Sequence, residues 1–178
     1  MPKLTVCFVV MLLMCLLCFE GFGDLMKIEV TSGAFKNGEM IPGKYTRDGD
    51  GVSPSIAWSN IPAGSKSIAL ISNDPDAVGG DFVHWVIFNI PPDAKGLPEN
   101  IPVEDMLSDG TIQGVNDARE IGYCSPCPPS GTHRYYFKVY ALDKALDLLP
   151  GAPRSGLLKA MKGHILANGE LMGLYKRR

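Results

Sequence analysis

The sequence predicts a mainly β protein, folded as an antiparallel β-sandwich or barrel. Three observations support this. The periodic segments are short and apolar, clusters of Gly, Pro, Asp and Asn separate them, and one late segment has helical periodicity. The regular alternation of strands and helices in a doubly wound α/β fold is missing, as are the glycine-rich loops that bind nucleotide phosphates.

Six segments have the length and composition of strands. In chain order they are Lys27–Thr31, Ile56–Trp58, Ser67–Asn73, Phe82–Asn89, Arg134–Leu142 and Glu170–Tyr175. The connections Thr46–Ser55 and Asn89–Asn100 are rich in Pro, Gly, Asp and Asn, which favour turns. Many short strands joined by such loops favour a sandwich or barrel.

The segment Phe82–Asn89 is apolar on both faces of the predicted strand. Because side chains alternate across a strand, His84 and Val86 are expected on one face and Trp85 on the other. A strand that is apolar on both faces is expected in the middle of a sheet. His84 would then be buried and would need a hydrogen-bond partner.

One face of the next predicted strand changes from polar to apolar along its length. The residues of this face are His133, Tyr135, Phe137, Val139 and Ala141. A strand that leaves the mouth of a pocket and enters the core has this pattern. His133 and Tyr135 would stand side by side at the mouth, roughly 7 Å apart along the strand.

The motif Asp74-Pro75-Asp76 follows the apolar strand Ser67–Asn73. It can be turn chemistry alone, but it can also place a carboxylate beside a histidine and orient the ring. Each histidine taken singly is more simply a structural residue. The combination of Asp74 with two histidines and a tyrosine predicts a polar pocket.

One helix is predicted near the C-terminal end of the chain. Ser155 can cap its first turn, and Asn168-Gly169 is a typical stop signal. The apolar residues that fall on one helical face are Leu157, Leu158, Met161, Ile165 and Leu166. The sequence therefore predicts a helix from Ser155 to about Asn168, followed by a short strand.

Length and charge limit the classes of function. The chain has 178 residues, which suits one domain with a sizeable core. Its net charge is -2 and its pI is about 5.9, and the only dense cluster of cations is Lys176-Arg177-Arg178. A nucleic-acid-binding domain would present a basic face, so no nucleic-acid partner is expected.

The first residues have the pattern of a secretory signal peptide. Lys3 supplies a positive charge, and residues 4–19 form an almost unbroken apolar run. Gly21 and Gly23 are small residues at the positions that precede a cleavage site before Asp24. The run is shorter than the roughly 20 residues that span a membrane comfortably.

This pattern sets the expected domains and compartment. A signal peptide is predicted over residues 1–23 and a folded domain over 24–178, exported to the periplasm or outside the cell. If Met26 is instead the true start, the protein is cytoplasmic. In an oxidising compartment Cys124 and Cys127 could form a disulfide, which would be tight because only two residues separate them.

Five stretches occur in the order and spacing of one known family. They are DGDGVSPSIAW, NDPDA, FVHWVIFNIP, PCPPSGTHRYYFKVYALD and LLKAMKGHILANGELMGLY. The chain resembles the phosphatidylethanolamine-binding protein (PEBP) family, and more closely its bacterial and archaeal Raf-kinase-inhibitor-like branch. The resemblance extends from about Met26 to Tyr175.

The resemblance implies an antiparallel β-sandwich with Greek-key features and a small anion pocket at one end. Such a pocket accepts phosphate-like groups, for example a phospholipid head group or a phosphorylated residue. Matched motif by motif, the implied site residues are Asp74, Asp76, His84, Pro126, Cys127, His133 and Tyr135. The imidazoles, the phenol and loop N–H groups can donate to an oxyanion, whereas the carboxylates would disfavour a fully ionised ligand.

The expected function is non-enzymatic binding of a small anionic or phosphorylated ligand, without a cofactor. Modulation of a partner protein such as a kinase or protease fits the resemblance, and a homodimer is compatible with it. Two stretches depart from the family pattern. Cys124-Ser125 replaces two glycines before Pro126, and Ala118-Arg119 replaces Phe-Gly after Asn116-Asp117. The loop and the outer rim of the pocket are therefore expected to differ.

Two other chemistries use the same residues. A thiol hydrolase would take Cys127 as nucleophile, His133 or His84 as base and Asp74 as the orienting carboxylate. A metal site could combine the two histidines with an aspartate in a 2-His-1-carboxylate arrangement. A C-x-x-C oxidoreductase is disfavoured because its motif belongs at a helix N-terminus, whereas prolines and a strand surround these cysteines.

Overall fold

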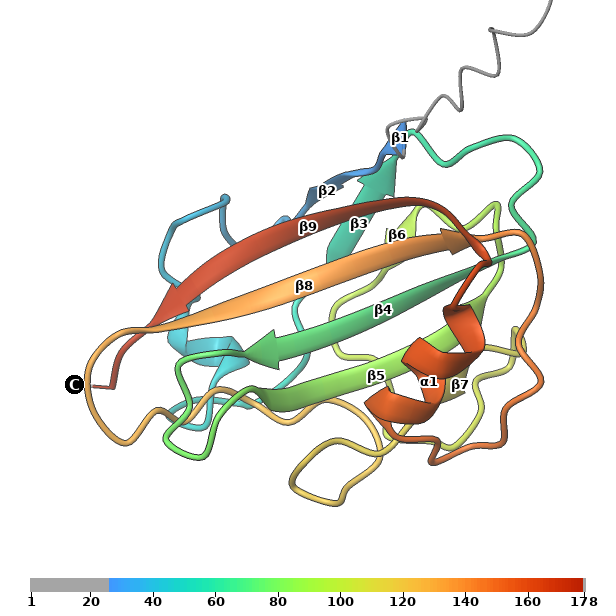
Figure 1. Cartoon of the computed structure of the whole chain (residues 1–178). Helices are drawn as coiled ribbons and strands as arrows, with labels where there is room; N and C mark the ends of the chain where they lie inside the picture. Colours follow the sequence, from blue (N-terminus) through green and yellow to red (C-terminus); the bar gives the residue numbers. More distant parts are fainter. Residues whose placement is uncertain (1–25, 178) are drawn as a thin grey trace, which may run out of the picture.

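The chain folds into two packed β-sheets with one helix on the outer face of the larger sheet (Figure 1). The computed structural model describes residues 26–177, so the predicted signal peptide lies outside the described residues. The larger sheet has six strands in the order β1-β9-β8-β4-β5-β7, and the smaller has three in the order β2-β3-β6. The predicted mainly β sandwich with one late helix is confirmed.

The elements have the following bounds. The strands are β1 (Met26–Lys27), β2 (Glu29–Thr31), β3 (Ile56–Ser59), β4 (Ser67–Asp74), β5 (Phe82–Ile90), β6 (Gly96–Leu97), β7 (Ile112–Gln113), β8 (His133–Leu142) and β9 (Ile165–Tyr175). A short 3₁₀ helix, η2, covers Gly43–Tyr45, and α1 covers Arg154–Met161. Paired strands are antiparallel except β1 and β9, which are parallel.

Two hydrophobic clusters stabilise this arrangement. The larger lies between the sheets and includes Trp58 of β3 together with Trp85 of β5 and Phe137 of β8. The smaller lies between the larger sheet and α1, where Leu157 and Met161 are fully buried. The larger sheet is therefore apolar on both faces, which explains the nearly continuous apolar runs of β4 and β5.

The predicted helix is wrong in its cap and at its C-terminal end. Its N-cap is Pro153, which makes no side-chain hydrogen bond, and Ser155 lies inside the helix. It begins at Arg154 and ends at Met161, and Gly163 with a φ of 81° turns the chain away. The segment from Ile165 onward is strand β9, which is longer than predicted. Pairing with β8 along its whole length satisfies its backbone groups, and this tertiary pairing outweighs the local helical periodicity.

The predicted alternation along β5 is wrong beyond His84. Asn73 of β4 pairs with Val83, and Ser72 pairs with Trp85, so His84 is the extra residue of a β-bulge. A bulge exchanges the two faces of the strand beyond it.

The clusters follow this exchange. Trp85 and Ile87 lie in the cluster between the sheets, and Val86 and Phe88 lie in the cluster under α1. His84 therefore does not share its face with Val86.

Within residues 26–177 no helix is long and apolar enough to cross a membrane.

Candidate functional site

A pocket of about 410 Å³ lies at the end of the larger sheet where β4 ends and β5 and β8 begin. Figure 1 shows this end on the left, at the tip of the β4 arrow. The strands contribute Asp74, Phe82, His84, His133 and Tyr135. The loops contribute Arg47, Ala77, Val78, Gly79, Cys124, Ser125, Cys127, Pro128 and Pro129.

The sheet order explains why these strand residues meet. β4 lies between β5 and β8 and is antiparallel to both, so its last residue lies beside the first residues of its two neighbours. Asp74 is paired with Phe82, and Asn73 is paired with Tyr136. Segments that are distant in the sequence thus place an aspartate between two histidines.

The Asp74 carboxylate orients His133. Nδ1 of His133 donates to Oδ2 of Asp74 at 2.7 Å, and both side chains are buried. The other oxygen, Oδ1, accepts the backbone N–H of Asp76 at 2.8 Å. With Nδ1 engaged, Nε2 is the nitrogen through which His133 can contact a ligand.

Asp76 stabilises the wall of the pocket but does not line it. It accepts three hydrogen bonds from Arg134: from Nε at 2.9 Å, from Nη2 at 2.7 Å and from the backbone N–H at 2.9 Å. These bonds lower the pKa of Asp76 from 3.8 to about 2. The ion pair ties the turn after β4 to the start of β8 and leaves the guanidinium of Arg134 already occupied.

His84 makes two hydrogen bonds with the loop opposite. Its Nδ1 donates to the Cys124 carbonyl at 2.6 Å, and its own carbonyl accepts the Cys124 N–H at 2.8 Å. The ring packs against Phe82 and Tyr135, with ring centroids 4.9 and 5.2 Å away. Burial lowers the pKa of His84 below 6.5, so the ring is neutral at pH 7.

Tyr135 presents a buried hydroxyl at the pocket. The residue is 1% exposed, and its hydroxyl has no hydrogen-bond partner of good geometry among the described residues. Burial and the nearby carboxylate of Asp74 raise the pKa of Tyr135, so the hydroxyl keeps its proton. Its contact with the Asp74 carboxylate is too poorly aligned to be a good hydrogen bond, so the hydroxyl is a donor that a well-placed ligand oxygen can accept.

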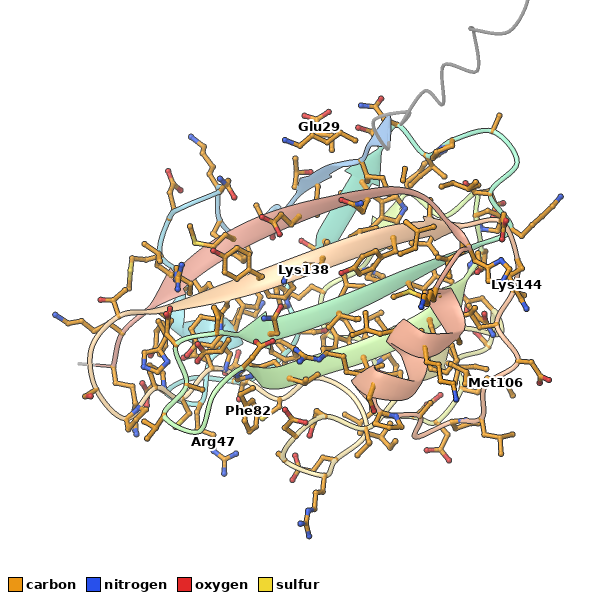
Figure 2. The ribbon with its side chains drawn as sticks, in the orientation of Figure 1. Glu29, Arg47, Phe82, Met106, Lys138 and Lys144 are labelled. Atoms are coloured by element: carbon orange, nitrogen blue, oxygen red, sulfur yellow. The ribbon has the colours of Figure 1, made fainter. Side chains whose placement is uncertain are left out.

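Arg47 is a pocket residue that the sequence did not indicate. It follows η2 and lines the pocket with an exposed side chain, for which residues 26–177 provide no ion-pair partner. Its backbone N–H donates to the Pro126 carbonyl at 3.0 Å, and the Tyr123 hydroxyl donates to the Tyr45 carbonyl at 3.0 Å. Figure 2 shows Arg47 and Phe82 at this end of the sheet.

No motif marks Arg47, because two loops distant in the sequence bring it to the pocket. One of them is the proline-rich loop, whose residues differ in whether they line the pocket. Pro126 is buried and binds the Arg47 loop through its carbonyl, so it supports the pocket without lining it. Cys127 is exposed and lines the pocket, whereas Cys124 is half-buried, and burial raises its pKa.

Both cysteines are free thiols in the structure. Within the described part of the chain, no hydrogen bond joins either thiol to an imidazole. Residues 26–177 also contain no group of three or more His, Cys, Asp or Glu side chains placed to hold a metal ion.

Residues 31–176 match the family described as phosphatidylethanolamine-binding protein. The chain belongs to this family. A UPF0098 protein of Methanothermobacter thermautotrophicus is 53% identical over 144 residues, which cover 81% of this chain and 95% of the relative. A UPF0098 protein of Aquifex aeolicus is 48% identical and covers 89% of this chain and 93% of the relative.

Two solved PEBP structures resemble this one. A putative PEBP homolog from Chlamydia trachomatis has a TM-score of 0.79 at 42% identity and covers 85% of this chain and 99% of its own. YbcL of E. coli, described as a new member of the mammalian PEBP family, has a TM-score of 0.79 at 31% identity and covers 86% and 100%. Both the predicted family and the PEBP-like sandwich are confirmed.

Proposed function

We propose that this PEBP-family protein is a non-enzymatic binding protein whose pocket holds the phosphate-like group of a small anionic ligand. The Tyr135 hydroxyl is the observation that carries the proposal. A buried polar atom without a partner of good geometry costs about 1–3 kcal/mol. Residues 26–177 contain four such side-chain atoms, and Tyr135 is the one of these residues that lines the pocket. A ligand oxygen in the pocket would accept this hydrogen and remove the cost.

Arg47 supplies the charge that such a ligand requires. A guanidinium can give two parallel hydrogen bonds to a phosphate, and these charge-assisted bonds are stronger than neutral ones. The other arginine beside the site, Arg134, is occupied by Asp76. Arg47 is therefore the cation of the pocket wall that is available to an anion.

The rim of the pocket suits an organic phosphate more than a free ion. Val78 is 88% exposed, and Phe82, Pro128 and Pro129 lie around the same opening. These apolar side chains can contact the carbon-containing part of a ligand whose phosphate is held below them. A phospholipid head group or a phosphorylated small molecule has this division.

The test is NMR titration with inorganic phosphate, phosphoethanolamine and a nucleotide, following the ring protons of His84 and His133. We expect at least one of these ligands to shift both rings. If none of the anions shifts either ring, the anion pocket is refuted. Ester or thioester turnover that disappears in Cys127→Ser would instead refute the non-enzymatic part of the proposal.

Export is a separate proposal. The leader predicts cleavage before Asp24, and the intact mass of the mature protein tests it. A mass that begins at Met26 would place the protein in the cytoplasm.

A further inference from the structure

We infer that the pocket selects an anion that carries a P–OH group, such as a singly protonated phosphomonoester or phosphonate, over an equally charged anion without an acidic hydrogen. The inference rests on the proposed function and narrows its ligands to phosphomonoesters and phosphonates, because the phosphodiester of an ordinary phospholipid head group has no P–OH. It follows from which groups of the pocket donate hydrogen bonds and which accept them.

His84 is a hydrogen-bond acceptor toward the pocket. A backbone carbonyl can only accept, so the contact of Nδ1 with the Cys124 oxygen requires the proton to be on Nδ1. In the neutral ring, Nε2 then carries a lone pair, and it has no partner among residues 26–177. The lowered pKa of His84 agrees with a neutral ring. A ligand that meets Nε2 must therefore bring a hydrogen.

Tyr135 and Arg47 have the opposite polarity. The Tyr135 hydroxyl is a buried donor without a well-aligned partner among residues 26–177, and Arg47 carries five N–H donors. Two unprotonated ligand oxygens can accept from these groups. The pocket thus combines donors from Tyr135 and Arg47 with an acceptor at Nε2 of His84. Nε2 of His133, whose Nδ1 hydrogen is donated to Asp74, is a second acceptor whenever that ring is neutral. A group that brings bare oxygens together with at least one hydroxyl, written R–PO₃H⁻, fits this combination.

Charge favours the same protonation state. The titratable and charged groups around His84 are Asp74, Asp117, Cys124, His133, Tyr135 and Arg47. Asp74 lines the pocket, so a doubly charged ligand would be held against a carboxylate. Retaining one proton on the ligand reduces this repulsion and also supplies the donor for Nε2.

The selectivity is expected to depend on pH in both directions. Phosphate monoesters lose their last proton with a pKa of about 6, so the P–OH is lost at higher pH. At lower pH the ring of His84 becomes protonated, Nε2 becomes a donor, and the preference for an acidic hydrogen disappears. The preference should therefore be largest at a pH above the lowered pKa of His84 and below the last pKa of the ligand.

Methylphosphonate and methanesulfonate provide a matched test. At pH 6 both are tetrahedral and chiefly singly charged, and methylphosphonate has one more hydroxyl hydrogen. We expect calorimetric titration to show methylphosphonate binding about tenfold more tightly, as one additional hydrogen bond allows. The preference should be lost in His84→Phe, because Phe has no acceptor, and kept in His164→Phe, because His164 contacts Asp143 away from the pocket.

A measurement on the unaltered protein removes any dependence on how the variants fold. ¹⁵N NMR of the histidine rings should show His84 protonated at Nδ1, with its Nε2 resonance shifted by methylphosphonate and not by methanesulfonate. Equal affinity for the two anions, or tighter binding of methanesulfonate, overturns the selectivity and leaves the anion pocket standing. Failure of both to bind overturns the anion pocket as well.

Discussion

Tyr135 and Arg47 offer hydrogens to the pocket in different ways. Tyr135 is 1% exposed and is positioned by the core of β8, whereas Arg47 is exposed on a loop and is free to adapt. A rigid buried donor defines where a ligand oxygen must lie, and a flexible charged donor adds attraction. Substitutions at these two positions should therefore differ in their effect on stability.

Arg47→Gln should weaken phosphate binding about tenfold and leave the midpoint of chemical denaturation unchanged. The reason is that Gln retains hydrogen-bonding groups but lacks the charge, and a charge-assisted bond is roughly twice as strong as a neutral one. Lys95→Gln is the matched control, because Lys95 is an exposed cation that does not line the pocket. Equal loss of binding in both variants would show a general effect of net charge.

His84 should make the protein less stable as the pH falls below 6.5. The pKa of His84 is lowered in the folded state, so the unfolded chain takes up a proton at higher pH than the folded protein does. The contribution of neutral His84 to the free energy of unfolding is complete above pH 6.5. It is lost as the pH falls toward the lowered pKa that His84 has in the folded protein. Urea denaturation of the protein and of His84→Gln at pH 7.5 and pH 5.5 measures it. If the protein and the His84→Gln variant lose the same stability between pH 7.5 and pH 5.5, the loss comes from other titratable groups.

At the scale of elements, the close approach of β9 to the chain before β2 depends on Gly169. A Cβ at this position would lie 2.0 Å from the carbonyl oxygen of Ile28, which is backbone and cannot move aside cheaply. Gly169→Ala should reduce the free energy of unfolding by about 1–3 kcal/mol, as overpacking does. Gly43→Ala, which meets no atom within 4 Å, should stay within about 1 kcal/mol of the original protein.

Chemical denaturation of the two glycine variants measures this difference. A Gly169→Ala variant as stable as Gly43→Ala would mean that β9 and Ile28 are farther apart than described. The same comparison also bears on the corrected helix boundary, because Gly169 would lie just after a helix if the sequence pattern alone decided it. In the structure it is a strand residue paired with Val139 of β8.

At the scale of the whole molecule, the larger sheet is held from both sides. One face packs against the smaller sheet, and the other packs against α1 through Leu157 and Met161. Burial on both faces keeps the ends of β4, β5 and β8 in register. The pocket at those ends therefore depends on packing at a distance from it.

Leu157→Ala should cost about 2–5 kcal/mol, because the side chain is fully buried and leaves a cavity. Leu158→Ala is the control. Leu158 is next to Leu157 in the helix but is 43% exposed, so its substitution should cost well under half as much. Thermal and urea denaturation measure both. Equal losses would contradict the face that α1 turns to the sheet, since the sequence pattern placed both leucines on one apolar face.

Much of this protein follows from its sequence. The principal strands, the family and the neighbourhood of Asp74, His84, His133 and Tyr135 could be predicted, because strand periodicity and short motifs are local signals. The two-residue strands β6 and β7 could not, because they are too short to have a period. The structure gives the positions of Asp74, His84, His133 and Tyr135, whereas the identity of the ligand stays a prediction.

The tertiary structure alone decided the rest. Strand pairing ended α1 at Met161 and placed the bulge at His84, because backbone hydrogen bonds to a neighbouring strand outweigh local periodicity. Contacts between distant loops brought Arg47 to the pocket and left Asp76 and Pro126 behind its wall. Sequence patterns report which residues are near one another along an element, whereas a binding site is built between elements.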